Sequence, residues 1–304
     1  MPDVVVMPRS VEEVAGVVRM CNDGGIPVVP FGAGTGLEGG VNAVMGGVSM
    51  DMMSMDKVVE VNSSDFDCIV EPGVTHEALN KRLHDTGLWF SVDPGADASI
   101  CGMAATGASG TNAVRYGTML HNILNLQVNP GYLLEHFSCG GPGGAYSMLK
   151  HDRDFRFILF IHMIFARKSA AGYNLTKLFI GSEGTLGVIT QATVRLQARP
   201  AVCSVAICPF PTVSKAIEAV VATIQCSVPI AKIEFLDATT VAACNKYSKL
   251  TLAESPTLFL EFHGNSEAEV ASQASLVGRI LLVAFVLQFT SFAVVLFEQL
   301  HCSA

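Results

Sequence analysis

The chain has 304 residues, of which 50% are hydrophobic and 15% charged, and its formal net charge is −8. This length is enough for about two domains, each with a core of its own. The sequence contains no cluster of Lys and Arg. That excludes a nucleic-acid-binding protein, because such proteins need a basic stripe to neutralise phosphates.

The nine cysteines are scattered without a CxxC pair. An odd and irregular set predicts thiols in a reducing compartment rather than a disulfide framework. His136 and Cys139 are close in sequence, but zinc needs further ligands at short spacings, so we predict no metal site. The first ten residues show neither the apolar region of a signal peptide nor the features of a transit peptide.

The first part of the chain mixes helix and strand signals. Residues 10–24 and 75–87 predict capped helices, residues 26–31 a short strand, and residues 88–118 mostly loop. A glycine-rich run, residues 32–40, follows the strand. Because strands and helices do not alternate as they do in βαβ units, the predicted fold class is α+β and not doubly wound.

The second part is less uniform. Residues 129–166 show no hydrophobic periodicity, which predicts an atypical insert. Residues 188–196 (VITQATVRL) predict a strand. Residues 201–265 alternate strand, helix, strand, helix and strand, which predicts a second domain with a ferredoxin-like beginning. The remaining residues, 266–304, form an apolar tail.

The glycine run satisfies GxGxxG at Gly34, Gly36 and Gly39. A Rossmann site would also need a helix directly after the run, and residues 40–47 (GVNAVMGG) are poor helix formers. A Rossmann enzyme that binds a nicotinamide cofactor is therefore only the second hypothesis for the cofactor. The run itself fits either a nest of backbone N–H groups for an anion or a plain turn.

Three more small-residue motifs follow: DPGADAS at 93–99, GMAATGASGTN at 102–112 and GSEGTLG at 181–187. Residues of this kind let a large flat group lie close to the backbone. Taken singly, each motif is also explained by a loop packing closely on a sheet. Their joint presence favours a cofactor site.

These motifs, together with PFGAGTGLEGG, VEPGV, RKSAAGYNLTKLFIGSEGTLGVIT and KIEFLD, resemble the FAD-binding PCMH-type flavoproteins of the vanillyl-alcohol oxidase family. Within that family they look like the cytochrome-linked D-lactate dehydrogenases. The resemblance covers residues 3–128 and 167–264. It implies a PCMH-type FAD-binding domain at 1–200, followed by an incomplete ferredoxin-like cap domain at 201–265.

The resemblance also implies roles for single residues in binding FAD. The backbone N–H groups of the first loop would hold the pyrophosphate: Gly32, Ala33, Gly34, Thr35, Gly36 and Leu37. Pro94, Gly95 and Ala96 would lie beside the flavin. The cradle would continue through Gly102, Thr106, Ser109, Gly110 and Tyr116, and the adenine and ribityl side would be closed by Glu183, Gly184, Gly187 and Ile189. Arg115 and Lys168 are the cations that could take part in the site. For each of them, a solvent-facing structural role is expected just as much as a functional one.

The implied reaction is oxidation of a D-2-hydroxy acid, D-lactate to pyruvate, with electrons passing from FAD to an acceptor such as cytochrome c in mitochondria. The HxGDGNxH-like and GEHG-like motifs of the family do not occur in this sequence. We can therefore name no catalytic base, and we predict impaired turnover for a chain that begins inside the FAD domain. His263 is expected to be structural. The alternative is a non-catalytic FAD-binding or membrane-attached variant.

Residues 280–297 form an apolar stretch near the lower length limit of a membrane span. Gln288, Thr290 and Ser291 weaken this interpretation. We favour a divergent C-terminus without a defined fold over membrane contact.

Overall fold

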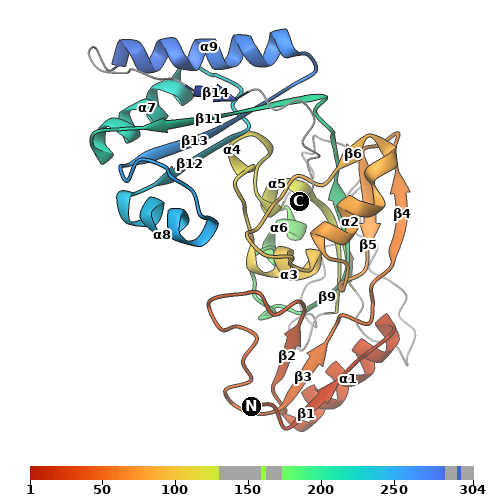
Figure 1. Ribbon diagram of the computed structural model, residues 1–304. Coiled ribbons are helices and arrows are strands. Elements are labelled where there is room, and N and C mark those ends of the chain that lie inside the picture. The colour runs from red at the N-terminus through yellow and green to blue at the C-terminus, as the bar shows by residue number, and fades with distance from the viewer. Residues whose placement is uncertain (130–158, 162–172, 285–292, 296–304) are drawn as a thin grey trace. The chain divides into compact units, whose positions relative to one another are not determined.

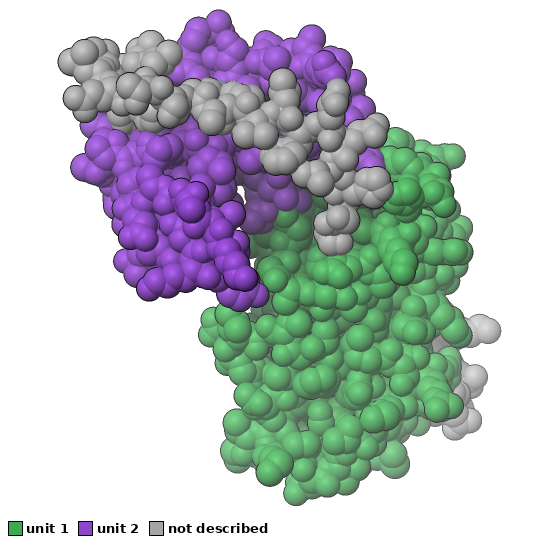
Figure 2. Space-filling model, in the orientation of Figure 1, with its two compact units in different colours: residues 1–110, 117–198 green, residues 111–116, 199–304 purple. Residues whose placement is uncertain are grey.

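The computed structural model describes residues 1–129, 159–161, 173–284 and 293–295. The chain divides into two compact units, coloured separately in Figure 2. Unit 1 comprises residues 1–110 and 117–198, and unit 2 comprises residues 111–116 and 199–304. The chain therefore passes between the units at three points, and a short segment from the first half of the sequence belongs to the second unit.

Unit 1 begins with a small parallel sheet and one helix (Figure 1). Its strands β1 (Val4–Val6), β2 (Val28–Phe31) and β3 (Val48–Asp51) lie in the order β1-β3-β2. Helix α1 spans Val11–Gly24, and the Ser10 side chain accepts a hydrogen bond from the Glu13 N–H at its start. This confirms the first predicted helix and its cap. After β2 the chain runs through turns to β3 without forming a helix, which removes the Rossmann interpretation.

A five-stranded antiparallel sheet forms the larger part of unit 1, in the order β4-β5-β9-β7-β8. Its strands are β4 (Val58–Asn62), β5 (Asp67–Val70), β7 (Ile123–Asn129), β8 (Leu159–Ile161) and β9 (Val188–Arg195). Two short strands, β6 (Leu88–Trp89) and β10 (Gln197–Ala198), pair separately. The helices of this part are α2 (His76–Arg82), α3 (Ile100–Thr106), α5 (Met119–Asn122) and α6 (Leu175–Phe179).

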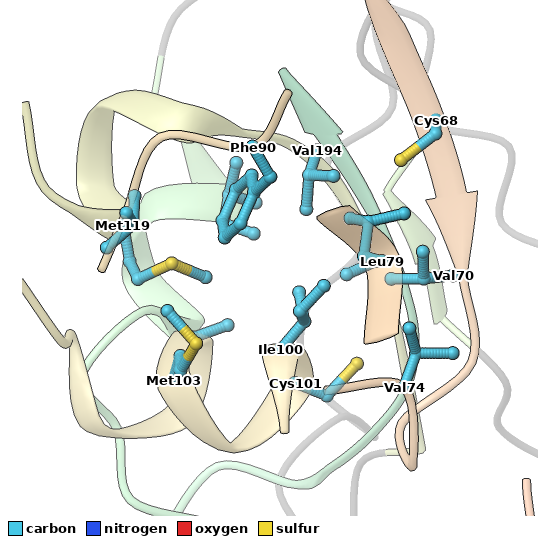
Figure 3. Packing of buried hydrophobic residues seen from close by; sticks show 14 of the residues in the cluster. Cys68, Val70, Val74, Leu79, Phe90, Ile100, Cys101, Met103, Met119 and Val194 are labelled. Atoms are coloured by element: carbon cyan, nitrogen blue, oxygen red, sulfur yellow. The ribbon is translucent and has the colours of Figure 1, made fainter. Parts of the chain in front are cut away.

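The core of unit 1 lies between this sheet and α3 (Figure 3). Phe90, Ile100 and Met103 are at most 1% exposed and belong to one cluster with Val70 of β5 and Val194 of β9. The sequence pattern of residues 88–118 predicts mostly loop and does not indicate α3. The reason is that α3 is short and largely buried, so it lacks the alternation of apolar and polar faces that identifies a helix in a sequence.

Unit 2 contains a four-stranded antiparallel sheet in the order β12-β13-β11-β14. Its strands are β11 (Val202–Pro209), β12 (Lys232–Leu236), β13 (Thr257–Gly264) and β14 (Ala293–Val295). Its helices are α7 (Val213–Gln225), α8 (Ala238–Ser248), α9 (Glu267–Ala284) and the one-turn α4 (Ala113–Tyr116). This strand order is that of a ferredoxin-like fold with α8 added between two strands, and it confirms the predicted α+β class.

The end of the chain differs from the predicted tail at 266–304. Helix α9 buries Val270, Ala274, Val277 and Leu281 in the core of unit 2, at the three- to four-residue spacing of one helix face. The described part of this region is thus folded onto the sheet. None of the helices in the described ranges combines the length and apolar composition that crossing a bilayer requires. Most of 129–166 and part of 280–297 lie outside the described residues, as do His136, Cys139 and Lys168.

Candidate cofactor site

The predicted pyrophosphate loop, Gly32–Leu37, leaves the end of β2 in unit 1. Thr35, Gly36 and Leu37 are exposed, and Gly34 has a φ of 70°, in the left-handed region that favours glycine. A Cβ atom at Gly36 would meet nothing within 4 Å. The loop is therefore open to solvent, at its glycine backbone and at the side chains of Thr35 and Leu37.

The side chain of Ser99 packs between this loop and α3. A Cβ atom at Gly32 would overlap the Ser99 hydroxyl, and one at Gly102 would lie 2.7 Å from the same oxygen. Ser99 is only 2% exposed and precedes the first residue of α3. A side chain at either position would therefore force the Ser99 hydroxyl to rotate or the backbone to move.

The predicted flavin loop, Pro94–Ala96, is fixed at both of its ends. On one side Gly110 lies so close to Asp93 that a Cβ atom would overlap the Asp93 carbonyl oxygen. On the other, Asp97 Oδ1 is 3.3 Å from Nδ1 of the buried His76 and accepts a hydrogen bond from the Glu77 N–H. Between these anchors Gly95 and Ala96 are exposed.

The fourth segment, Gly181–Gly187, attaches to the end of α3. The Gly181 N–H donates to the Ala104 carbonyl at 2.9 Å, and the Glu183 N–H donates to the Ala105 carbonyl at 2.8 Å. Glu183 has a φ of 49°, which is uncommon for a residue with a Cβ atom. A Cβ atom at Gly184 would lie 3.5 Å from Pro30 of β2. The segment thus connects α3 to the strand that carries the first loop.

The structure therefore gathers most of the predicted cofactor residues around α3 and the end of β2. Two of the predicted residues make contacts within the protein. Ile189 is only 7% exposed and belongs to the core, and the Thr106 hydroxyl donates a hydrogen bond to the Gly102 carbonyl at 3.1 Å. Ser109 is exposed. Tyr116 is the exception, since it belongs to unit 2 and not to the unit that carries the other residues.

In unit 2, Tyr116 is part of a polar cluster that sequence analysis did not find. Its hydroxyl is 2.8 Å from His263 Nδ1, and His263 Nε2 is 2.6 Å from Glu261 Oε1. Lys232 Nζ lies 3.5 Å from the other oxygen of Glu261. Burial acts to raise the pKa of Glu261, but the hydrogen bond from His263 and the charge of Lys232 outweigh it and leave this pKa lowered.

Arg115 contacts the backbone of the same cluster. Its guanidinium donates to the carbonyl of His263 at 2.9 Å and to that of Pro229 at 3.1 Å. The expected structural role of this cation therefore has direct contacts to account for it. A sequence signal for the cluster existed, because Glu261 and His263 alternate within the otherwise apolar strand TLFLEFHG.

The four loop segments of unit 1 contain no Lys or Arg between residues 32–37, 93–97, 99–110 and 181–187. An anionic group there would be held by backbone N–H groups and not by side-chain cations. Closely packed glycines around one serine, with exposed backbone beside them, suit a large flat cofactor with a pyrophosphate. The arrangement therefore fits FAD.

Comparison with known families decides the assignment. Residues 2–129 match the model of a family described as FAD binding domain, and residues 199–296 match one described as FAD linked oxidases, C-terminal domain. The chain belongs to the FAD-linked oxidases. This confirms the predicted family and FAD as its cofactor. The second match also continues beyond residue 264, where the resemblance seen in the sequence ended.

Two relatives of this chain have D-lactate dehydrogenase names. A probable mitochondrial D-lactate dehydrogenase of Danio rerio is 53% identical over 269 residues, which cover 88% of this chain and 50% of the relative. A mitochondrial D-lactate dehydrogenase [cytochrome] of Arabidopsis thaliana is 44% identical, with 92% and 45% covered. The chain spans about half the length of these relatives. Their mitochondrial names agree with the predicted localisation.

A solved structure of alkyldihydroxyacetonephosphate synthase superposes with a TM-score of 0.71 at 23% identity. The superposed region covers 92% of this chain and 50% of the synthase chain. At this identity the likeness shows the fold alone.

Proposed function

We propose that this FAD-linked oxidase oxidises a D-2-hydroxy acid, D-lactate to pyruvate, and passes the electrons to an acceptor such as cytochrome c in mitochondria. The observation that carries the proposal is that the first glycine-rich loop packs on Ser99, directly before α3, while Gly181 and Glu183 donate hydrogen bonds to the end of α3. The D-lactate dehydrogenase names of the Danio and Arabidopsis relatives support the choice of substrate, and the cytochrome in the Arabidopsis name supports the acceptor.

In this proposal the residues of unit 1 bind and orient the cofactor. The backbone N–H groups of Gly32–Leu37 hold the pyrophosphate, and Pro94–Ala96 lie along the ring system. The contact between His76 and Asp97 fixes the second loop, while Glu183, Gly184 and Gly187 close the remaining side. When bound, FAD supplies the two-electron acceptor for oxidation of the hydroxy acid.

Absorption spectroscopy of the purified chain tests the proposal. We expect a bound-flavin spectrum. Because the HxGDGNxH-like and GEHG-like motifs do not occur in this sequence, D-lactate added without oxygen should bleach the spectrum only slowly, and L-lactate should not bleach it. Absence of bound FAD would contradict the cofactor site. Bound FAD that D-lactate leaves oxidised would contradict the reaction for this chain and keep the site.

Two glycines of the first loop provide a matched pair for the cofactor site. Gly32→Ala places a methyl group against Ser99, whereas Gly36→Ala places it in open space. We expect Gly32→Ala to lower FAD affinity at least about tenfold and to lower the melting temperature of the FAD-free chain, because the methyl group must displace either the loop or the buried Ser99 hydroxyl. Gly36→Ala should leave that melting temperature unchanged. Equal melting temperatures for the two variants would show that Ser99 does not position the loop.

A further inference from the structure

We propose that Cys203, Glu261 and His263 form a zinc-binding site on the sheet of unit 2. This site goes beyond the proposed function, because its residues are separate from the predicted FAD residues of unit 1. One thiolate, one imidazole and one carboxylate would bind the ion, and a water molecule would take the fourth position.

Strand pairing brings the three side chains together. Cys203 of β11 is paired directly with His263 of β13, and Glu261 lies two residues before His263 on the same strand. Side chains two residues apart on a strand share a face, and paired residues do so as well. Alternate residues of the same strands, such as Leu260 and Phe262, point into the core instead. The three ligands therefore lie together on the face opposite that core.

The distances suit a small cation after side-chain rotation. The potential ligand atoms of the three residues all lie within 4.8 Å of one another. In a tetrahedral zinc site with bonds of about 2.0–2.3 Å, ligand atoms are roughly 3.3–3.8 Å apart. The contact of 2.6 Å between His263 Nε2 and Glu261 Oε1 is shorter, as expected when a proton joins them. Zinc would replace that proton, and these two atoms would separate by about an ångström.

The outer contacts already hold the histidine in place. Tyr116 Oη is 2.8 Å from His263 Nδ1, and a ligating histidine commonly has a partner of this kind on its second nitrogen. A hydroxyl can donate to Nδ1 or accept from it, so Tyr116 satisfies either tautomer. When Nε2 becomes a ligand, the imidazole stays neutral because Nδ1 takes up a proton. The thiol of Cys203 releases its proton to solvent, so zinc binding releases one proton in total.

Lys232 is the neighbouring group that opposes a cation. Its ammonium lies 3.5 Å from Glu261 Oε2, and the side chains of Lys232 and Glu261 are only 28% and 21% exposed. The Arg115 guanidinium donates hydrogen bonds to the backbone carbonyls of Pro229 and His263. Removing the charge of Lys232 should therefore strengthen zinc binding, because the repulsion between the ammonium and the ion disappears.

Cobalt titration of the full chain, stripped of metal with a chelator, tests the site. Co²⁺ bound to a cysteine gives a thiolate-to-metal absorption band, and Zn²⁺ should abolish that band by displacing cobalt. We expect Cys203→Ser to remove the band and to lower the affinity at least about tenfold. Cys226→Ser is the matched control, because Cys226 is an exposed thiol outside the cluster. It should change nothing.

Two further variants test the surroundings of the site, and only Tyr116→Phe distinguishes a built site from an ion held by the Glu261 carboxylate alone. Tyr116→Phe should weaken cobalt binding about 10–100-fold without removing the band, because it loses only the outer contact. Lys232→Met should tighten binding several-fold. A band that survives Cys203→Ser, a chain that binds no cobalt, or a Lys232→Met variant with unchanged affinity would each overturn the proposal. None of these readouts depends on flavin reduction, so the proposed function can fail while the zinc site holds.

Discussion

At the scale of single residues, the glycines of unit 1 differ in what surrounds them. Gly110 has the Asp93 backbone where a Cβ atom would be, whereas a Cβ atom at Gly95 would meet nothing within 4 Å. Both were assigned to the FAD site by resemblance alone. The difference separates a glycine that is needed for folding from one whose absent side chain leaves room for a ligand.

We predict that Gly95→Leu lowers FAD affinity at least about tenfold and leaves the melting temperature of the FAD-free chain unchanged. The added side chain fills open space in the protein but would collide with a flavin beside the loop. FAD titration followed by flavin fluorescence measures the first effect, and thermal unfolding the second. Gly110→Ala should instead destabilise the FAD-free chain. Unchanged affinity in Gly95→Leu would place the flavin elsewhere.

Buried thiols give a second prediction at this scale. Burial raises the pKa of Cys208 to about 12, and burial together with the charge of Asp67 does the same for Cys68. In the unfolded chain these thiols ionise near pH 9.0, the ordinary value. Their contribution to the free energy of unfolding is therefore complete below pH 9 and is lost as the pH rises toward 12.

Urea unfolding at pH 8, 9 and 10 measures this loss. Cys208→Ala should reduce the decline in stability across the series, because it removes one thiol that ionises only when unfolded. Cys226→Ser should leave the decline as it is, since Cys226 is exposed. An identical slope in Cys208→Ala and the original chain would contradict the assignment.

At the scale of elements, the two units use helices in different ways. Helix α9 is long and packs one face on its sheet through Val270, Ala274, Val277 and Leu281. Helix α3 is short and largely buried, and its last turn receives hydrogen bonds from Gly181 and Glu183. One helix therefore stabilises a domain, and the other organises loops around a candidate cofactor site.

We predict that Val277→Ala lowers the free energy of unfolding of unit 2 by about 1–3 kcal/mol, because it leaves a cavity under α9. Chemical denaturation measures the change. Arg279→Ala, on the exposed side of the same helix, should stay within about 0.5 kcal/mol of the original chain. If both variants behaved alike, α9 would not be packed as described.

At the scale of the whole molecule, the chain does not divide into units in sequence order. Residues 111–116 belong to unit 2 although unit 1 precedes and follows them. Arg115 and Tyr116 from this segment contact His263 of β13. A substitution in residues 111–116 should therefore change the stability of unit 2.

We predict that Arg115→Ala destabilises β13 by about 1–3 kcal/mol, because the carbonyl of His263 loses a charged donor. Hydrogen exchange measured by mass spectrometry should show faster exchange in peptides covering residues 257–264. Peptides covering residues 188–195 of β9 in unit 1 should exchange as before. Equal changes in both regions would indicate general unfolding, and no change would show that the contact contributes little.

The sequence by itself determined the fold class, the family and FAD, because those depend on patterns along the chain. Helix α1 has its cap at Ser10 and its left-handed glycine at Gly25, and both are local signals. The four glycine-rich motifs also appear in order along the sequence. Their roles in binding FAD remain predictions, but the residues themselves needed no structure to be found.

Only the tertiary structure decided which distant residues meet. Ser99 contacts two glycine segments through close packing, and no property of Ser99 alone indicates this. Cys203 faces His263 because antiparallel register pairs them across two strands, and register is fixed by the whole hydrophobic pattern of a sheet. The resemblance implies a place for Tyr116 in the FAD cradle, and the structure puts Tyr116 in unit 2, with its hydroxyl against His263 of the same unit. Local patterns specify elements, whereas contacts between elements depend on how the complete chain buries its apolar faces.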